Sequence, residues 1–113
     1  MSDPASQLRI QDSKQRLKQA YDTAVSTKES AESDFKEAED AGFTDGQDFK
    51  QWSLQNAPVW SVALNDYQGA KAAYSAALQH GDKEASQAWE KKYREAVLGD
   101  NPAKPDYDVL VEP

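Results

Sequence analysis

One face of the segment 58–79 alternates very large and very small side chains, and this pattern constrains the fold more than any other feature. Three aromatic residues and three alanines take turns along it: Trp60, Ala63, Tyr67, Ala70, Tyr74 and Ala77. Steps of three and four residues place all six side chains on one face of an α-helix. Because large and small side chains interlock across a helix–helix contact, this face predicts close packing against a second helix.

The first forty residues carry a complementary pattern. Asp3 and Pro4 are typical of a helix start, and no further proline or glycine occurs before Gly42, a residue type that commonly ends helices. We therefore expect one helix of about 36 residues, roughly 54 Å long, that ends near Asp40. Its apolar seam repeats every seven residues and shrinks from bulky side chains to alanine: Ile10, Leu17, Ala24, Ala31 and Ala38. The aromatic side chains of 58–79 fit the hollows around these alanines, which predicts a coiled-coil-like hairpin.

Three further helices follow from local signals. Thr44 and Gln47 match the capping-box pattern, which predicts the start of a short helix that ends near Asn56. Pro58 separates this helix from the next one, over 58–79. Gly81 ends that helix, and the last helix runs over 82–98 with Asp82 as its cap.

Together these signals predict an all-α protein. The expected architecture is an antiparallel helical bundle of three long helices plus one short helix, formed by residues 1–99. An extended or flexible C-terminal tail, residues 100–113, follows it. If the other helices leave part of the first helix uncovered, an end of about 15 Å projects and offers a surface to a second copy.

The overall charge excludes several classes of partner. The chain has 20 acidic and 13 basic residues, a net charge of −7. This balance disfavours binding to nucleic acids and to anionic membrane surfaces, both of which attract basic proteins. No stretch is apolar and long enough to span a bilayer, and the N-terminus lacks the core of a signal peptide. We therefore expect a cytoplasmic protein, although a secreted chain trimmed of its signal would look the same.

No combination of residues predicts catalysis. The chain has no cysteine, which excludes disulfides and thiolate metal sites, and its one histidine, His80, is expected to lie at a helix end. Asp40, Asp45 and Asp48 lack the spacing of a calcium loop. The carboxylates do not lie among apolar residues that could tune them for acid–base chemistry. We therefore expect no catalytic residues, no cofactor, no metal site and no enzymatic activity.

Two groups of residues are candidates for binding a protein partner. Trp52, with Phe49 beside it in a short polar helix, is the best candidate for an exposed aromatic anchor. The second group comes from an acidic segment, residues 29–48, which holds eight carboxylates and one lysine. Its candidate binding residues are Glu29, Glu32, Glu37 and Asp40. Such a segment is a solvated face without a role, a surface for a basic partner, or the antiparallel partner of the basic end of another copy.

These observations favour a small, non-enzymatic helical protein–protein interaction module that self-associates through its alanine and aromatic seams. The alternative is an acidic inhibitor or mimic that binds a basic protein surface through residues 29–48. A third hypothesis is an aromatic pocket for a small apolar ligand among Trp60, Tyr67 and Phe35. Salt separates the first two, because binding that depends on charge weakens steeply at high ionic strength.

Overall fold

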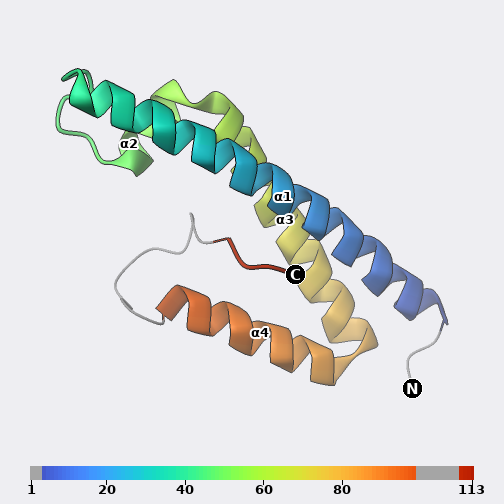
Figure 1. Cartoon of the computed structure of the whole chain (residues 1–113). Coiled ribbons are helices and arrows are strands. Elements are labelled where there is room, and N and C mark those ends of the chain that lie inside the picture. Colours follow the sequence, from blue (N-terminus) through green and yellow to red (C-terminus); the bar gives the residue numbers. More distant parts are fainter. Residues whose placement is uncertain (1–3, 99–109) are drawn as a thin grey trace.

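The computed structural model describes residues 4–98 and 110–113, and over these residues the chain forms four helices and no strand (Figure 1). The helices are α1 (Pro4–Asp40), α2 (Phe49–Asn56), α3 (Pro58–Gly81) and α4 (Lys83–Leu98). The prediction of an all-α chain with three long helices and one short helix is confirmed. None of the described helices combines the length and the apolar character needed to cross a membrane. Residues 100–109 of the predicted tail lie outside the described residues.

Helices α1 and α3 lie side by side and run in opposite directions, and their contact forms most of the core (Figure 1). Both predicted seams meet there. On α1, Leu17 and Ala24 have no exposed surface, and on α3 neither do Tyr67 and Ala70. Trp60 is 1% exposed. The alternation of large and small side chains is therefore used within one chain, and the prediction that 58–79 packs against the first helix is confirmed.

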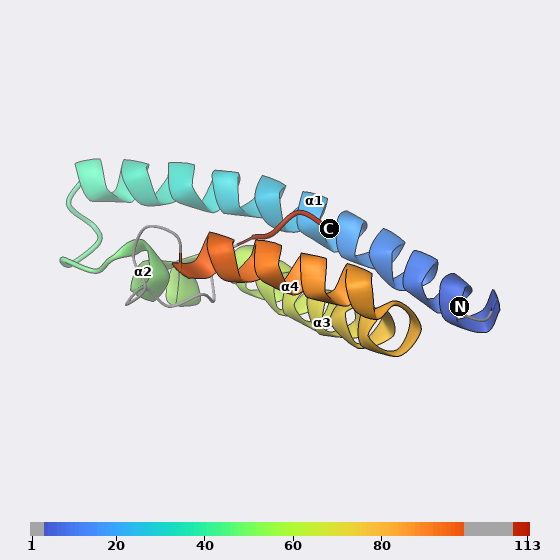
Figure 2. The same ribbon diagram turned by 90° about the horizontal axis from the view of Figure 1, so that it is seen from below.

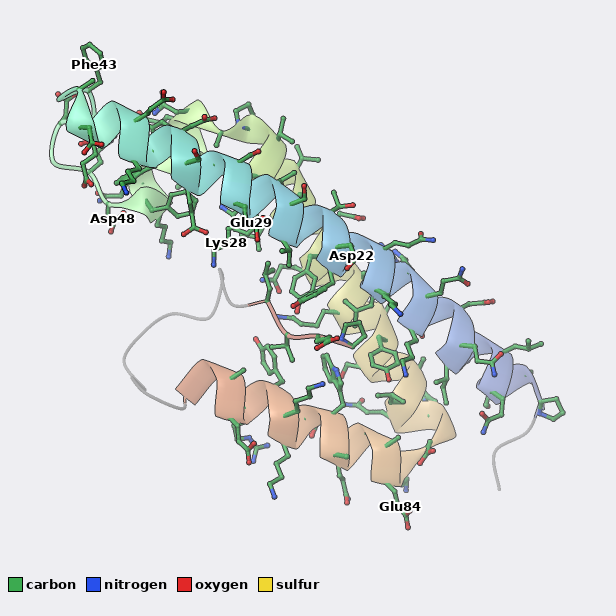
Figure 3. All side chains as sticks on the ribbon, in the orientation of Figure 1. Asp22, Lys28, Glu29, Phe43, Asp48 and Glu84 are labelled. Atoms are coloured by element: carbon green, nitrogen blue, oxygen red, sulfur yellow. The ribbon has the colours of Figure 1, made fainter. Side chains whose placement is uncertain are left out.

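Helix α1 ends where the sequence predicts. Gly42 has a φ of +81°, the left-handed conformation that glycine adopts without steric cost. Its N–H donates to the carbonyl of Glu39, and the N–H of Phe43 donates to the carbonyl of Ala38. These two bonds form a Schellman motif, which satisfies carbonyls that the helix end leaves free. Phe43 itself is 77% exposed and points away from the helices (Figure 3).

The predicted start of α2 is wrong by four residues. Asp45 and Gly46 both have positive φ values, which a right-handed helix starting at Thr44 cannot contain. Thr44 and Gln47 instead close a turn, in which the Gln47 N–H donates to the Thr44 carbonyl. The capping box is formed by Asp48: its Oδ1 accepts from the N–H of Gln51 at 2.8 Å, and the Gln51 Oε1 accepts from the N–H of Asp48 at 3.4 Å.

The two remaining helix junctions follow the predictions. Ala57 is the C-cap of α2 and the N-cap of α3, so the chain breaks at Pro58, which occupies the first turn of α3. Proline is favoured there because its missing N–H needs no partner. Helix α3 continues through Gly81, two residues beyond the predicted Gln79. Asp82 caps α4, accepting a 3.0 Å hydrogen bond from the N–H of Ala85.

The C-terminal segment Leu110–Pro113 fills the wedge between the helices. Helix α4 packs on α3 alone among the described helices, with Trp89 edge-on to Tyr74 at 5.5 Å between ring centroids. It diverges from α1, and the segment runs through the space that remains (Figures 1 and 2). Val111 is buried there, and Leu110 packs against the core. This end of the predicted tail is extended and packed on the helices.

The expected projecting end of α1 is absent from the structure. At the start of α1, a Cβ atom built on Gly81 would lie 2.7 Å from the Cδ1 of Ile10, so α3 reaches this end. Near the other end, Phe35 contacts Phe49 and Trp52 of α2. One side of α1 is thus covered along its length. The molecule is elongated and flat, with Cα extents of 58 × 27 × 15 Å.

Candidate functional site

Trp52, the predicted exposed anchor, is buried, and this part of the prediction is wrong. Its side chain is 7% exposed and meets the ring of Phe35 edge-on at 5.5 Å. Phe49 is partly buried and bridges Phe35, at 5.8 Å, and Trp60, at 6.5 Å. Because these four rings join α1, α2 and α3, Trp52 and Phe49 attach the short helix to the hairpin. They leave little aromatic surface for a partner.

The four acidic candidates are exposed on the outward side of α1. At 3.6 residues per turn, Glu29 and Asp40 lie nearly in line, and Glu32 and Glu37 lie to either side of them. The four carboxylates therefore spread over about 140° of the helix circumference. The structure places them on a broad acidic surface and does not gather them into one narrow stripe.

A hollow lies along the line where α1 meets the first half of α3. It consists of two adjoining cavities of about 350 and 530 Å³, which share Thr27, Pro58 and Val59. We call this feature the α1–α3 groove. The first cavity also includes Ser30, Asp34 and Trp60, and the second includes Thr23, Val62, Ala63 and Asp66.

The α1–α3 groove is apolar in its second cavity and open to solvent. Val59 and Val62 are 68% and 69% exposed, since Trp60 and Ala63 take the positions that face α1. On the α1 side, the Thr27 hydroxyl donates back to carbonyls of its own helix at 2.8 and 3.1 Å. Three residues apart on α3, the two valines form an exposed apolar surface beside the hollow.

Charged side chains mark both ends of the groove. At one end, Arg16 and Asp66 form an ion pair at 3.8 Å, with both side chains more than half exposed. Exposed pairs of this kind add at most about 1 kcal/mol to stability. At the other end, Asp34 lines the first cavity. The groove thus has an ion pair at the end of its apolar second cavity and a carboxylate at the end of its first cavity.

Buried polar groups lie in the core, among α1, α3, α4 and the C-terminal segment. The Tyr67 hydroxyl donates to the carbonyl of Val111 at 2.9 Å and accepts from its N–H at 2.6 Å. Burial raises the pKa of Tyr67 above 10.0, although the hydrogen bond with Val111 acts in the opposite direction. Burial also raises the pKa of Tyr74. The Nε1 atoms of Trp60 and Trp89 are buried with no hydrogen-bond partner among the described residues.

The hypothesis of an aromatic pocket does not fit this arrangement. Trp60 and Tyr67 are packed in the core with 1% and 0% exposure, and Phe35 turns toward α2. Within residues 4–98 and 110–113, no three His, Cys, Asp or Glu side chains gather as a metal site would require. Comparison with protein families, curated proteins and solved structures finds no match for this chain.

The groove residues were missed at the level of sequence, although a signal is present. On α3, Val59 lies at the edge of the aromatic and alanine face, in line with Ala77, and Val62 lies beyond that edge. An apolar arc wider than one seam predicts contact with more than one neighbouring helix. Read in this way, the start of α3 already indicates a second packing surface.

Proposed function

We propose that this chain is a small, non-enzymatic helical protein–protein interaction module that self-associates. The observation that carries the proposal is the exposed apolar α1–α3 groove. The alanine seam of α1 and the aromatic seam of α3 are buried against each other within one chain. The surface left for a partner is therefore the outer side of the same hairpin. Helical proteins commonly bind another helix in a groove of this kind.

The expected affinity is modest. Full burial of a valine contributes about 1.5–3 kcal/mol, and Val59 and Val62 each retain about two thirds of their surface exposed. Four such valines in a dimer supply roughly 4–8 kcal/mol, comparable with the cost of association. The remaining groove surface must therefore supply the net free energy of binding. We expect a dissociation constant of about 1–100 µM.

Solution mass tests self-association. We expect light scattering behind size exclusion, over a range of protein concentrations, to show the mass rise from 12.5 kDa toward twice that value. The association should persist when salt increases from about 0.1 M to about 1 M, since apolar contacts are not screened. A chain that remains monomeric at about 1 mM in both salts would contradict the proposal.

The acidic surface of α1 supports a second candidate function, binding to a basic protein. Residues 29–48 hold eight carboxylates and one lysine, and six of these carboxylates lie on α1. We expect polylysine to bind the chain at low salt and to dissociate at high salt. The triple variant Glu29→Gln, Glu32→Gln and Glu37→Gln should weaken this binding several-fold.

A matched control removes the same number of charges from α4, at Glu84, Glu90 and Glu95. Titration calorimetry with both triple variants then separates a local site from net charge. If the control weakens polylysine binding as much as the α1 variant does, the attraction reflects net charge alone, and the acidic surface is not a binding site.

A further inference from the structure

Two opposite charges share one line along the groove side of α1. Arg16 and Asp34 are eighteen residues apart, which is five full turns at 3.6 residues per turn. They therefore point in the same direction from the helix axis, separated by about 27 Å. Asp34 lines the first cavity, and Arg16 reaches Asp66 of the second. Asp34 thus lines the α1–α3 groove, and Arg16 lies beside its other end, paired with Asp66.

The apolar second cavity of the groove lies halfway along α1 between Arg16 and Asp34. Residue 25 is the midpoint of Arg16 and Asp34, and it is also the midpoint of Thr23 and Thr27, which both line the groove. Val62, 69% exposed, lines the same cavity from α3. At equal spacing along α1, the surface therefore carries the Arg16–Asp66 ion pair, the apolar second cavity and the Asp34 carboxylate. A surface with this pattern matches itself when one copy is turned through 180°.

We propose that the groove is the two-fold interface of a homodimer, in which α1 packs antiparallel to the partner's α1. The two copies of Val62 lie near the two-fold axis, and Arg16 of each copy meets Asp34 of the other. Arg16 then lies between two carboxylates, its own Asp66 and the partner's Asp34, which a planar guanidinium accommodates. This inference rests on the proposed self-association and specifies its surface and register.

The shape of the molecule favours a second copy as the occupant. A stable interface takes about 800 Å² from each partner, roughly a tenth of the 7502 Å² surface of this chain. The Cα extents of 58 × 27 × 15 Å describe a slab whose broad faces are large enough for this. Helix α4 and the C-terminal segment pack on α3 away from the two cavities, and their residues do not line the groove. Two slabs stacked face to face would form a four-helix arrangement of two α1 and two α3 helices.

The variant Val62→Lys tests the surface. Two ammonium groups near the axis repel each other, and we expect the dimer dissociation constant to rise about a hundredfold or more. Leu54→Lys is the matched control, because Leu54 is 62% exposed on α2 and does not line the groove. The control should dimerise like the wild type, and both variants should retain the wild-type circular dichroism.

Charge reversal tests the register. Arg16→Asp and Asp34→Arg should each weaken the dimer several-fold, because each places like charges opposite one another. The double variant restores opposite charges across the interface and should dimerise more tightly than either single variant. A double variant no tighter than the weaker single variant would overturn the antiparallel register.

The outcomes for the interface and for the proposed function are distinct. A wild-type chain that is monomeric at all concentrations contradicts self-association and with it the interface. A wild-type dimer that Val62→Lys leaves intact contradicts only the interface, and self-association through another surface then stands. A groove that binds helices of other proteins but not a second copy would also overturn the homodimer.

Discussion

Replacement of Trp60 by alanine is expected to lower the free energy of unfolding by about 3–5 kcal/mol, the typical cost of removing a buried tryptophan. Trp60 is 1% exposed and belongs to the core between α1 and α3. Its ring also contacts Phe49, so the cavity loosens the attachment of α2. Domains of this size are stable by about 5–15 kcal/mol in total. Urea unfolding followed by circular dichroism measures the loss.

The matched control is Leu54→Ala on α2. Leu54 is 62% exposed, and an exposed substitution of this kind changes stability by no more than about 0.5 kcal/mol. If Trp60→Ala costs as little as Leu54→Ala, the aromatic side of α3 is not the core of the hairpin. The unpartnered Nε1 of Trp60 offsets a small part of the expected loss, because alanine buries no polar atom.

The hairpin of α1 and α3 could be predicted from sequence because its signals are local and periodic. Ala24, Ala31 and Trp60 fall in register with neighbours three, four and seven residues away, and these spacings alone define a buried face. Helix ends at Gly42, Pro58 and Asp82 follow from single residue types with one strong preference each. The start of α2 could not be predicted in this way, since Thr44 and Asp48 are both good caps. The choice between them depends on the left-handed turn at Asp45 and Gly46.

The candidate site was less accessible to sequence reasoning because exposure depends on contacts between distant segments. Trp52 lies in a polar stretch that predicts an exposed ring, and only the packing of Phe35 against it shows otherwise. Val59 and Val62 read as part of an apolar helix, and their exposure depends on where α1 and α4 lie. Charge is different: the separation of Arg16 and Asp34 by five turns is fixed by the sequence. The structure adds the position of the groove relative to Arg16 and Asp34, and this position is what relates their spacing to a binding surface.

Removal of the Tyr67 hydroxyl, by Tyr67→Phe, is expected to cost about 1–3 kcal/mol of stability. The hydroxyl makes both hydrogen bonds that hold Val111, as donor at 2.9 Å and as acceptor at 2.6 Å. Without it, the buried N–H and carbonyl of Val111 lose their partner. The cost is therefore a desolvation penalty at the C-terminal segment, 44 residues away in sequence. Chemical unfolding measures this loss of stability. The control is Tyr74→Phe on the same face, because the described residues provide no hydrogen bond for the Tyr74 hydroxyl.

A double-mutant cycle shows whether the C-terminal segment carries this effect. Deletion of residues 110–113 should destabilise the wild type but add little to Tyr67→Phe, because both changes remove the same contacts.

The pH dependence of stability gives a second readout. The pKa of Tyr67 is raised in the folded chain, so its contribution is fully present below pH 10.0, the ordinary pKa of tyrosine, and is lost as pH rises through the folded value. Tyr67→Phe should therefore lose less stability above pH 10.0 than the wild type does. Equal alkaline losses in the two proteins, together with additive costs in the cycle, would mean that Tyr67 stabilises the chain through its ring alone.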